Sequence, residues 1–294
     1  MFHVEHCMKT HKTHKTHMNL KDHSVSGERF KLLVDPYYGF LYTDPKPSDK
    51  DLKAYYSDVG YISHNNQLRS FVDAMYHVAR YVSLKRKIRL IKPFMLKSGA
   101  LLDIGAGTGH FVRSASLAGW DVTGIEPSST AREIANSKGR CLVFDEEALG
   151  AFSEGSFDVI TLWHVLEHLP SPLESIEVFK KLLKPNGRIF VAVPNYKSYD
   201  SRYFKNFWAA YDVPRHLWHF SKNSIIKVFS KSQMSLESTH PMLMDAYYVS
   251  MLSNKYKSGS HKILNSLWTG LLSNAKAFRT GEYSSLIYVL KKSD

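Results

Sequence analysis

The fold is decided by one stretch of the sequence, Leu101-Leu102-Asp103-Ile104-Gly105-Ala106-Gly107-Thr108-Gly109. An apolar run ends in three glycines at alternate positions, and a helix-forming segment, 109–118, follows. Glycine lets the backbone turn tightly and approach a ligand closely. The stretch therefore predicts a strand, a ligand-binding turn and a helix, which together make the first unit of an α/β domain.

Strand and helix patterns continue to alternate after this turn. Strands are expected over 122–125, 141–144, 157–163 and 188–193, and helices over 128–137 and 171–184. Repeated β–α units of this length predict a doubly wound, mostly parallel sheet with helices on both faces. Two later apolar segments, near 235–243 and 285–290, predict an antiparallel hairpin at the edge of that sheet.

The chain divides into three parts. Residues 1–23 hold six of the fifteen histidines, and residues 9–17 repeat every three residues without helical or strand periodicity, which predicts a disordered tail. Residues 24–97 predict a small lobe rich in Tyr and Pro, followed by a basic helix over 70–96. Residues 98–294 then form the main domain.

Two insertions interrupt the main domain. Residues 194–221 contain nine aromatic side chains, and residues 245–280 predict two helices joined at Ser258-Gly259-Ser260. Both insertions leave the sheet at its carboxyl edge, where open α/β folds bind ligands. We expect residues 194–221 to pack as a lid over the ligand site, with Arg215 and His216 facing inward.

Composition excludes several classes of protein. Hydrophobic residues make up 44% and charged residues 22% of the 294, which is ordinary globular usage and excludes a disordered chain. No apolar run has the length of a membrane helix, and the polar N-terminus has no secretory apolar region, so we expect a cytoplasmic protein. The net charge of +12 favours anionic partners without choosing among them. The basic residues of 80–97 form either a solvated helix face or an anion-binding surface.

Carboxylates follow the second and third expected strands. Glu126 lies 21 residues after Gly105, where a carboxylate can accept both ribose hydroxyls of a nucleoside; the alternative is a surface acid. Asp145 can reach an adenine amino group or can be an exposed turn residue. A dinucleotide fingerprint would need a third glycine at position 110, which is His110, so a nicotinamide-dependent oxidoreductase is disfavoured.

These residues resemble the class I S-adenosylmethionine-dependent methyltransferases. The resemblance covers about 100–193, and extends to 211–221 and 61–64, which look like the methyltransferase type 11, 12 or 23 subgroup that includes ubiquinone-pathway O-methyltransferases. It implies a seven-stranded sheet and S-adenosylmethionine as the cofactor. The cofactor contacts that it implies are Asp103, Gly105, Gly107, Gly109, Glu126, Asp145, Trp163, His164 and, from the N-terminal lobe, Tyr61.

Four side chains are candidates for catalysis. His164 and His168 follow the fourth expected strand, and Arg215 and His216 lie in the aromatic insertion. A neutral imidazole is available as a general base near pH 7, although His168 is equally explained by a hydrogen bond to the backbone. Arg215 either binds a carboxylate or phosphate of the acceptor or pairs with Asp212 and fixes the loop.

No metal is expected. Many relatives carry a Cys-x-x-Cys-Gly zinc pair before the Pro-rich turn, and here the matching residues 35–39 contain no cysteine. Ubiquinone-pathway enzymes have acids and a His that can hold a divalent metal after the fourth strand, but His164 replaces the first acid. A trio of His164, Glu167 and His168 is the remaining way to hold a metal.

The function indicated is methyl transfer from S-adenosylmethionine to the oxygen or nitrogen of a small-molecule or glycan-type acceptor. Two alternatives remain open. The charge of +12 suits a nucleic-acid methyltransferase, although the segment after the fourth strand lacks an amino-methylation motif. The glycine turn and Glu126 also suit a non-catalytic S-adenosylmethionine-binding protein. The acceptor and the oligomeric state do not follow from the sequence.

Overall fold

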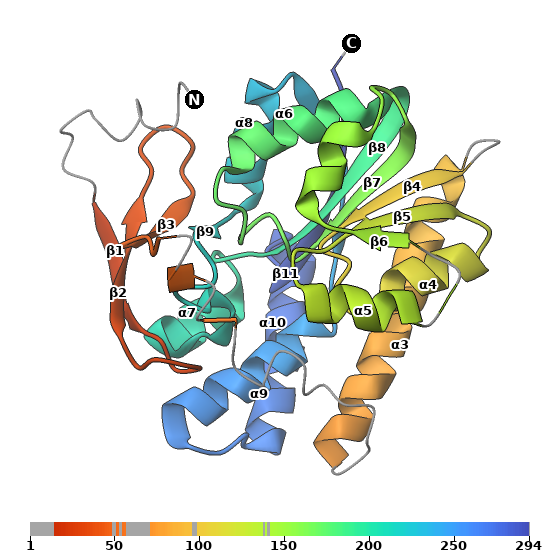
Figure 1. Ribbon diagram of the computed structural model, residues 1–294. Coiled ribbons are helices and arrows are strands. Elements are labelled where there is room, and N and C mark those ends of the chain that lie inside the picture. Colours follow the sequence, from red (N-terminus) through yellow and green to blue (C-terminus); the bar gives the residue numbers. More distant parts are fainter. Residues whose placement is uncertain are drawn as a thin grey trace.

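Strand β4 (Ala100–Ile104), which the glycine turn follows, lies between β7 and β5 in a seven-stranded sheet (Figure 1). The computed structural model describes residues 15–48, 51–52, 55–56, 71–95, 99–137, 139 and 142–293. The strand order is β10-β11-β8-β7-β4-β5-β6. The other strands are β5 (Asp121–Ile125), β6 (Leu142–Phe144), β7 (Phe157–Trp163), β8 (Leu183–Pro194), β10 (Met234–Pro241) and β11 (Ser285–Lys292).

The pairing confirms the predicted doubly wound sheet. The strands β6, β5, β4, β7 and β8 are parallel to one another, and β11 runs antiparallel to both β8 and β10. The edge hairpin is therefore present where the sequence predicted it. Strand β8 begins earlier than expected, at Leu183, because Leu183 pairs with Phe157 while residues 184–187 bulge out before Arg188 pairs with Val159.

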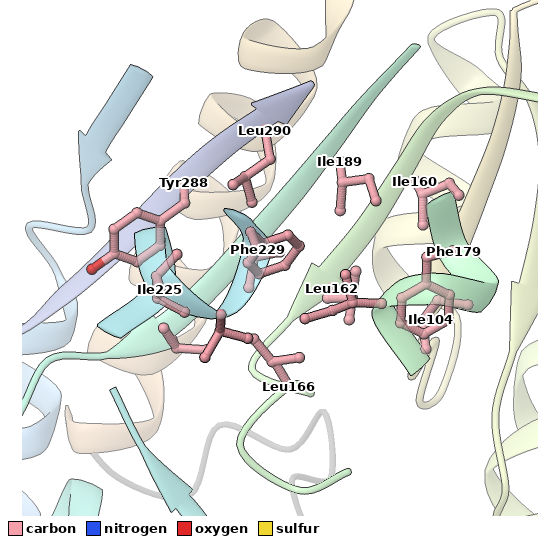
Figure 2. Packing of buried hydrophobic residues seen from close by; sticks show 14 of the residues in the cluster. Ile104, Ile160, Leu162, Leu166, Phe179, Ile189, Ile225, Phe229, Tyr288 and Leu290 are labelled. Atoms are coloured by element: carbon pink, nitrogen blue, oxygen red, sulfur yellow. The ribbon is translucent and has the colours of Figure 1, made fainter. Parts of the chain in front are cut away.

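Helices cover both faces of the sheet, as Figure 1 shows. On one face α6 (Pro172–Leu182) and α8 (Lys222–Lys231) pack on alternate side chains of the strands, and Figure 2 shows Phe179 and Phe229 among Ile160, Leu162 and Ile189. On the other face lie α3 (Phe71–Ile91), α4 (His110–Leu117) and α5 (Ser129–Ser137). Burial on both faces explains the nearly continuous apolar sequence of the central strands.

The helix expected over 70–96 ends earlier, at Ile91. A single 3₁₀ turn, η1 (Lys92–Phe94), follows it with Pro93 at its start. Proline has no backbone N–H to continue an α-helix. The basic segment is therefore a helix that packs one face on the sheet through Leu84, Ile88 and Ile91.

A second, antiparallel sheet forms the N-terminal lobe. It consists of β1 (Thr16–Lys21), β2 (Arg29–Val34), β3 (Leu41–Asp44) and β9 (Trp218–His219), in that order. Strand β9 comes from the aromatic insertion and pairs with β3. The lobe therefore contains residues from both sides of the domain boundary predicted at residue 97. The lobe and the main domain therefore share an element.

The predicted disordered tail, 1–23, was too long. Residues 1–14 lie outside the described residues, but Thr16–Lys21 form β1, in which Leu20 is buried opposite Phe30. Asp22 then accepts hydrogen bonds from the backbone of Ser24 and Ser26 and so fixes the turn into β2. The last two residues of the His-Lys-Thr repeat, Thr16 and His17, thus begin a short strand that the sequence pattern did not predict.

The two insertions have different structures. The aromatic insertion folds into α7 (Tyr199–Phe204), the 3₁₀ turns η3 (Lys205–Phe207) and η4 (Ala209–Tyr211), and strand β9. The second forms a helical hairpin of α9 (Asp245–Ser258) and α10 (Ile263–Thr280), as predicted. Gly259 ends α9 in a left-handed conformation with φ of 75°, which glycine adopts without strain.

Candidate functional site

The glycine turn after β4 has one open position. Gly105, Gly107 and Gly109 all have positive φ, at 72°, 54° and 78°. A Cβ on Gly105 would lie 2.4 Å from Val165, and one on Gly109 would lie 2.9 Å from Ala135. A Cβ on Gly107 would meet nothing within 4 Å. Gly105 and Gly109 are thus required by packing, whereas Gly107 leaves space for a ligand.

Glu126 lies against this turn from the end of β5. Its Oε2 accepts the N–H of Gly107 at 2.8 Å, and its Oε1 accepts the N–H of Ser128 at 3.0 Å. The side chain is 4% exposed, so it is not the surface acid of the alternative interpretation. Each carboxylate oxygen keeps a further lone pair, which a ribose hydroxyl can use.

Asp103 is buried beside the turn, near the end of β4. Thr161 donates a hydrogen bond to its Oδ1 at 2.6 Å. Burial raises the pKa of Asp103 to about 7, against the opposing effects of Thr161 and Lys87. A carboxyl group with such a pKa gains from a cationic ligand group, because a positive charge nearby favours its ionised form.

Asp145 and Tyr61 are two further predicted cofactor contacts outside the glycine turn. Asp145 follows β6, is exposed, and makes no capping hydrogen bond with its side chain, which agrees with either of its two interpretations. Tyr61 lies outside the described residues.

Trp163 and Lys87 are in contact at the end of β7. The Trp163 ring contacts Phe111 edge to face at 5.2 Å, and the Lys87 Nζ lies 4.4 Å from the Trp163 centroid. Burial lowers the pKa of Lys87 to about 8, although Asp245 and Asp103 oppose this shift. The buried Nε1 of Trp163 has no hydrogen-bond partner among the described residues. Lys87 therefore belongs to the site rather than to a solvated helix face.

His164 adopts a strained backbone conformation directly after β7, with φ of 60°. Its Nδ1 lies 3.3 Å from Glu167 Oε1, and its Nε2 lies 3.3 Å from Asp245 Oδ2. Burial alone would lower the pKa of His164, but the hydrogen bonds to Asp245 and Glu167 outweigh it and raise the pKa to about 9. The ring is therefore an imidazolium near neutral pH and links the sheet to α9.

A buried carboxylate and two imidazoles meet beside His164. One potential ligand atom from each of Glu167, His168 and His216 lies within 4.8 Å of the others. Within the described residues, these three side chains form a candidate metal site. Apart from the ion pair of its Oε1 with His164, Glu167, which is 1% exposed, has no side-chain partner among the described residues that meets hydrogen-bond geometry. The trio differs from the one that the sequence suggested, because His164 spans Glu167 and Asp245 and His216 takes its place.

The two imidazoles of this trio are held by backbone carbonyls. His168 Nδ1 lies 3.0 Å from Arg215 O, and His216 Nδ1 lies 2.9 Å from Ala210 O. A carbonyl only accepts, so the Nδ1 of each ring carries a proton and donates it to that carbonyl. Burial and the neighbouring His216 lower the pKa of His168 to about 4. His168 therefore fits the backbone-bonded interpretation and stays neutral.

Arg215 pairs with Asp212, as one of its two interpretations required. Its Nη2 donates to Asp212 Oδ1 at 2.6 Å. The same Nη2 lies 3.4 Å from Ser24 Oγ in the N-terminal lobe. Arg215 therefore fixes the aromatic insertion, and it also lines the cavity described next.

One cavity of about 460 Å³ brings together Lys87, His164, Asp245 and the Arg215–His216 pair, whereas the glycine turn, Glu126 and Asp103 are not among its lining residues. His164 lines it from the sheet, Arg215 and His216 from the aromatic insertion, and Asp245 from α9. The remaining lining is largely apolar and aromatic, with two further basic side chains from α3. Its members include Met242, Met244, Tyr247, Tyr248, Val249, Met251, Leu252, Tyr256, Arg80 and Lys87.

The sequence from α3 to β10 matches a known family. A family model described as a methyltransferase domain matches residues 76–239, which is more than half of the chain. The chain belongs to this methyltransferase family. Membership confirms the resemblance drawn from the glycine turn and Glu126, and with it S-adenosylmethionine as the expected cofactor of the domain.

Relatives of this methyltransferase domain include two ubiquinone biosynthesis O-methyltransferases. The protein from Paraburkholderia phymatum is 38% identical over 108 residues, which are 34% of this chain and 47% of that protein. The protein from Vibrio cholerae is 36% identical over 108 residues, 34% of this chain and 44% of its own length. The matches thus span less than half of each relative.

Solved structures share the fold. Magnesium protoporphyrin IX methyltransferase from Synechocystis PCC 6803 has a TM-score of 0.57 at 14% identity, over 84% of this chain and 100% of that one. Geranyl diphosphate C-methyltransferase from Streptomyces coelicolor A3(2) has a TM-score of 0.55 at 12% identity, over 84% and 99%. These likenesses support the predicted fold class. Among the described residues, no helix has the length and apolarity needed to cross a bilayer.

Sequence reasoning missed two participants and named a third. Lys87 was one of several basic residues in its segment and Asp245 lay in an expected helix, whereas Glu167 was already part of the suggested metal trio. Only the folded chain brings Asp245 to His164, from which it is separated by 80 intervening residues. The lack of any acid but Asp245 in α9 is the one signal that could have marked it.

Proposed function

We propose that this chain is an active S-adenosylmethionine-dependent methyltransferase that modifies a small, amphipathic acceptor in the cavity beside His164. The observation that carries the proposal is the continuity of the cavity with the end of β7, since Lys87 and His164 line it and Lys87 also lies over Trp163. The charge and the apolar lining of this cavity then indicate the chemical class of the acceptor.

The described residues fit the cofactor. Gly107 leaves an open position, Glu126 keeps lone pairs for ribose, and the Trp163 Nε1 has no partner within the described part of the chain. Asp103 and Lys87 offer opposite charges for the amino and carboxylate groups of an amino acid moiety. Asp145 is assigned to the adenine. When bound, S-adenosylmethionine supplies a methyl group on a positively charged sulfur.

We assign the role of general base to His216. Its Nδ1–H is committed to Ala210 O, so its Nε2 lone pair is available to take a proton from the acceptor. Asp212 Oδ2, at 3.8 Å from that Nε2, would stabilise the imidazolium that forms. His164 does not fit this role, because its raised pKa keeps it protonated. His164 and Arg215 are assigned to positioning.

The lining favours an acceptor that has an apolar body and an anionic group. Three methionines adapt to irregular apolar surfaces, and tyrosines from α9 add flat contact area. Arg80, Lys87, Arg215 and charged His164 outnumber the acids Asp212 and Asp245 on the same wall. A carboxylate or phosphate would therefore be attracted, whereas a neutral glycan would find few matching polar groups.

A labelled-cofactor assay against fractionated small-molecule extract tests this function. His216→Gln should lower turnover about 100-fold or more and keep the affinity for S-adenosylhomocysteine within about threefold. His240→Gln is the matched control, since His240 lies on β10 and is half-buried away from the cavity lining. Equal turnover for the two variants would remove His216 from the chemistry. Cofactor binding without transfer to any fraction would favour the non-catalytic alternative, and transfer to RNA the nucleic-acid alternative.

A further inference from the structure

Helix α10 presents its large apolar side chains to solvent. Phe278 is 85% exposed, Leu264 84%, Trp268 59% and Leu271 49%. With about 100° between successive residues, these four side chains and Ala275 fall within an arc of about 80° on one side of the helix. We call these residues, Leu264, Trp268, Leu271, Ala275 and Phe278, the apolar stripe.

The opposite side of α10 consists of small residues and packs inward. Ser266, Thr269, Gly270, Ser273 and Ala277 are the buried residues of this helix. A Cβ on Gly270 would lie 3.0 Å from the Tyr247 Cα of α9, so α9 and α10 approach closely. A helix that only covers a protein core has the reverse arrangement, with large apolar residues inside. The apolar stripe therefore faces a partner outside this chain.

Charge identifies the partner. Residues 246–281, which span α9, α10 and their connection, contain no Asp or Glu and contain five basic residues. Arg279 directly follows Phe278, and Lys262 lies two residues before Leu264; both are exposed, whereas the Nζ of Lys276 lies 3.8 Å from the Tyr199 ring centroid. Exposed Trp, Phe and Leu on one side with Lys and Arg beside them are typical of helices that lie in the interface of a bilayer.

We propose that the apolar stripe of α10 docks on the surface of an anionic lipid bilayer. Its Trp, Phe and Leu side chains enter the headgroup boundary, and the exposed Lys262 and Arg279 contact anionic headgroups at its two ends. A second copy of the chain fits less well, because it would bring the same five positive charges against each other without an acid to pair with. This surface is separate from the cavity and does not depend on methyl transfer.

Vesicle co-sedimentation tests the proposal. The full chain should bind vesicles of phosphatidylcholine mixed with phosphatidylglycerol at least about tenfold more tightly than vesicles of phosphatidylcholine alone. Raising the salt from about 0.1 M to about 0.5 M should weaken that binding, because exposed charges are screened. The double variant Leu264→Ser/Phe278→Ser should bind at least about tenfold less.

Leu117→Ser is the matched control, because Leu117 is 61% exposed on α4, away from the apolar stripe. This variant should bind as the wild type does, and thermal melting should show that all variants stay folded. Tryptophan fluorescence gives a second readout. Trp120, Trp208 and Trp218 are buried, whereas Trp268 is 59% exposed, so vesicles should shift emission to the blue in the wild type and not in Trp268→Phe.

Two outcomes would overturn the proposal. One is binding to anionic vesicles no stronger than to neutral ones, or equal binding by the double variant and Leu117→Ser. The other is a concentration-dependent dimer in sedimentation velocity that the double variant abolishes, in the absence of vesicle binding. The second outcome would assign the apolar stripe to contact between copies of the chain.

Discussion

The two insertions line the same cavity, but the aromatic insertion buries most of its large side chains whereas helix α10 of the other exposes most of its own. In the aromatic insertion, Trp208 is 2% exposed and its Nε1 donates to Asp200 at 2.7 Å. In the helical hairpin, Trp268 is 59% exposed. A high content of large apolar residues thus shows that a segment needs a partner, but it does not show whether that partner lies within the same chain.

Replacing the two tryptophans tests this comparison with the largest expected effect. Trp208→Ala should lower the free energy of unfolding by about 3–5 kcal/mol, because it empties a buried site and removes one of the hydrogen-bond donors to Asp200. Trp268→Ala should change it by less than about 0.5 kcal/mol, because an exposed ring leaves no cavity. Urea unfolding of both variants measures this, and similar losses would show that the exposed ring is packed in solution.

Asp200 joins the two insertions, and its replacement has the next largest expected effect. The buried carboxylate accepts from Trp208 Nε1, from Ser273 Oγ of α10 at 2.8 Å and from Ser284 Oγ at 2.7 Å. Asp200→Asn replaces one acceptor oxygen with a donor, so at least one of these three donors loses its partner. We expect a loss of about 2–4 kcal/mol.

Asp51→Asn is the control for Asp200→Asn, because its carboxylate accepts from Ser48 at an exposed site. Unfolding curves for the two variants that coincide would mean that Asp200 does not hold the insertions together.

The fold was largely predictable from the sequence because local patterns specify it. The glycine turn, the apolar runs of the central strands and the helical hairpin each depend on residues close together in the chain. The features that were missed depend on distant contacts. Leu20 of strand β1 is buried in a cluster with Trp208 and Val213 of the aromatic insertion, and β9 is a strand only because it pairs with β3.

The candidate site divides in the same way. Gly107 and Glu126 meet because they follow adjacent parallel strands, which the spacing already indicated. The state of His164 was not predictable, since its pKa depends on Asp245 from the helical hairpin. His164, which the sequence suggested as a general base, is therefore a cation in the structure.

The contact between His164 and Asp245 predicts a moderate pH dependence of stability. A raised pKa in the folded state stabilises the protein fully below the unfolded value of about 6.5, and the stabilisation is lost as the pH rises through about 9. Because His164 is partly exposed, we expect about 1–2 kcal/mol over this range. Asp245→Asn should flatten the decline measured by urea unfolding between pH about 6 and about 9.5, and an unchanged slope would contradict the assignment.

Metal removal has the smallest expected effect, which is none. His164 already places a positive charge 3.3 Å from Glu167, so the carboxylate of the candidate trio is neutralised without an ion. Turnover should survive dialysis against EDTA, and elemental analysis should find less than one zinc or magnesium per chain. A stoichiometric ion that is lost in Glu167→Gln would instead assign Glu167, His168 and His216 as its ligands.

Calorimetry with S-adenosylhomocysteine tests most directly whether the glycine turn and Glu126 bind this cofactor. We predict a micromolar dissociation constant, about 8 kcal/mol of binding free energy, for the wild type. Glu126→Ala should weaken binding by about 1–3 kcal/mol, because it removes charged hydrogen-bond acceptors, while Glu133→Ala on the neighbouring helix α5 should not change it. Tight binding of NAD together with no binding of S-adenosylhomocysteine, or equal affinity of the two variants, would contradict the account.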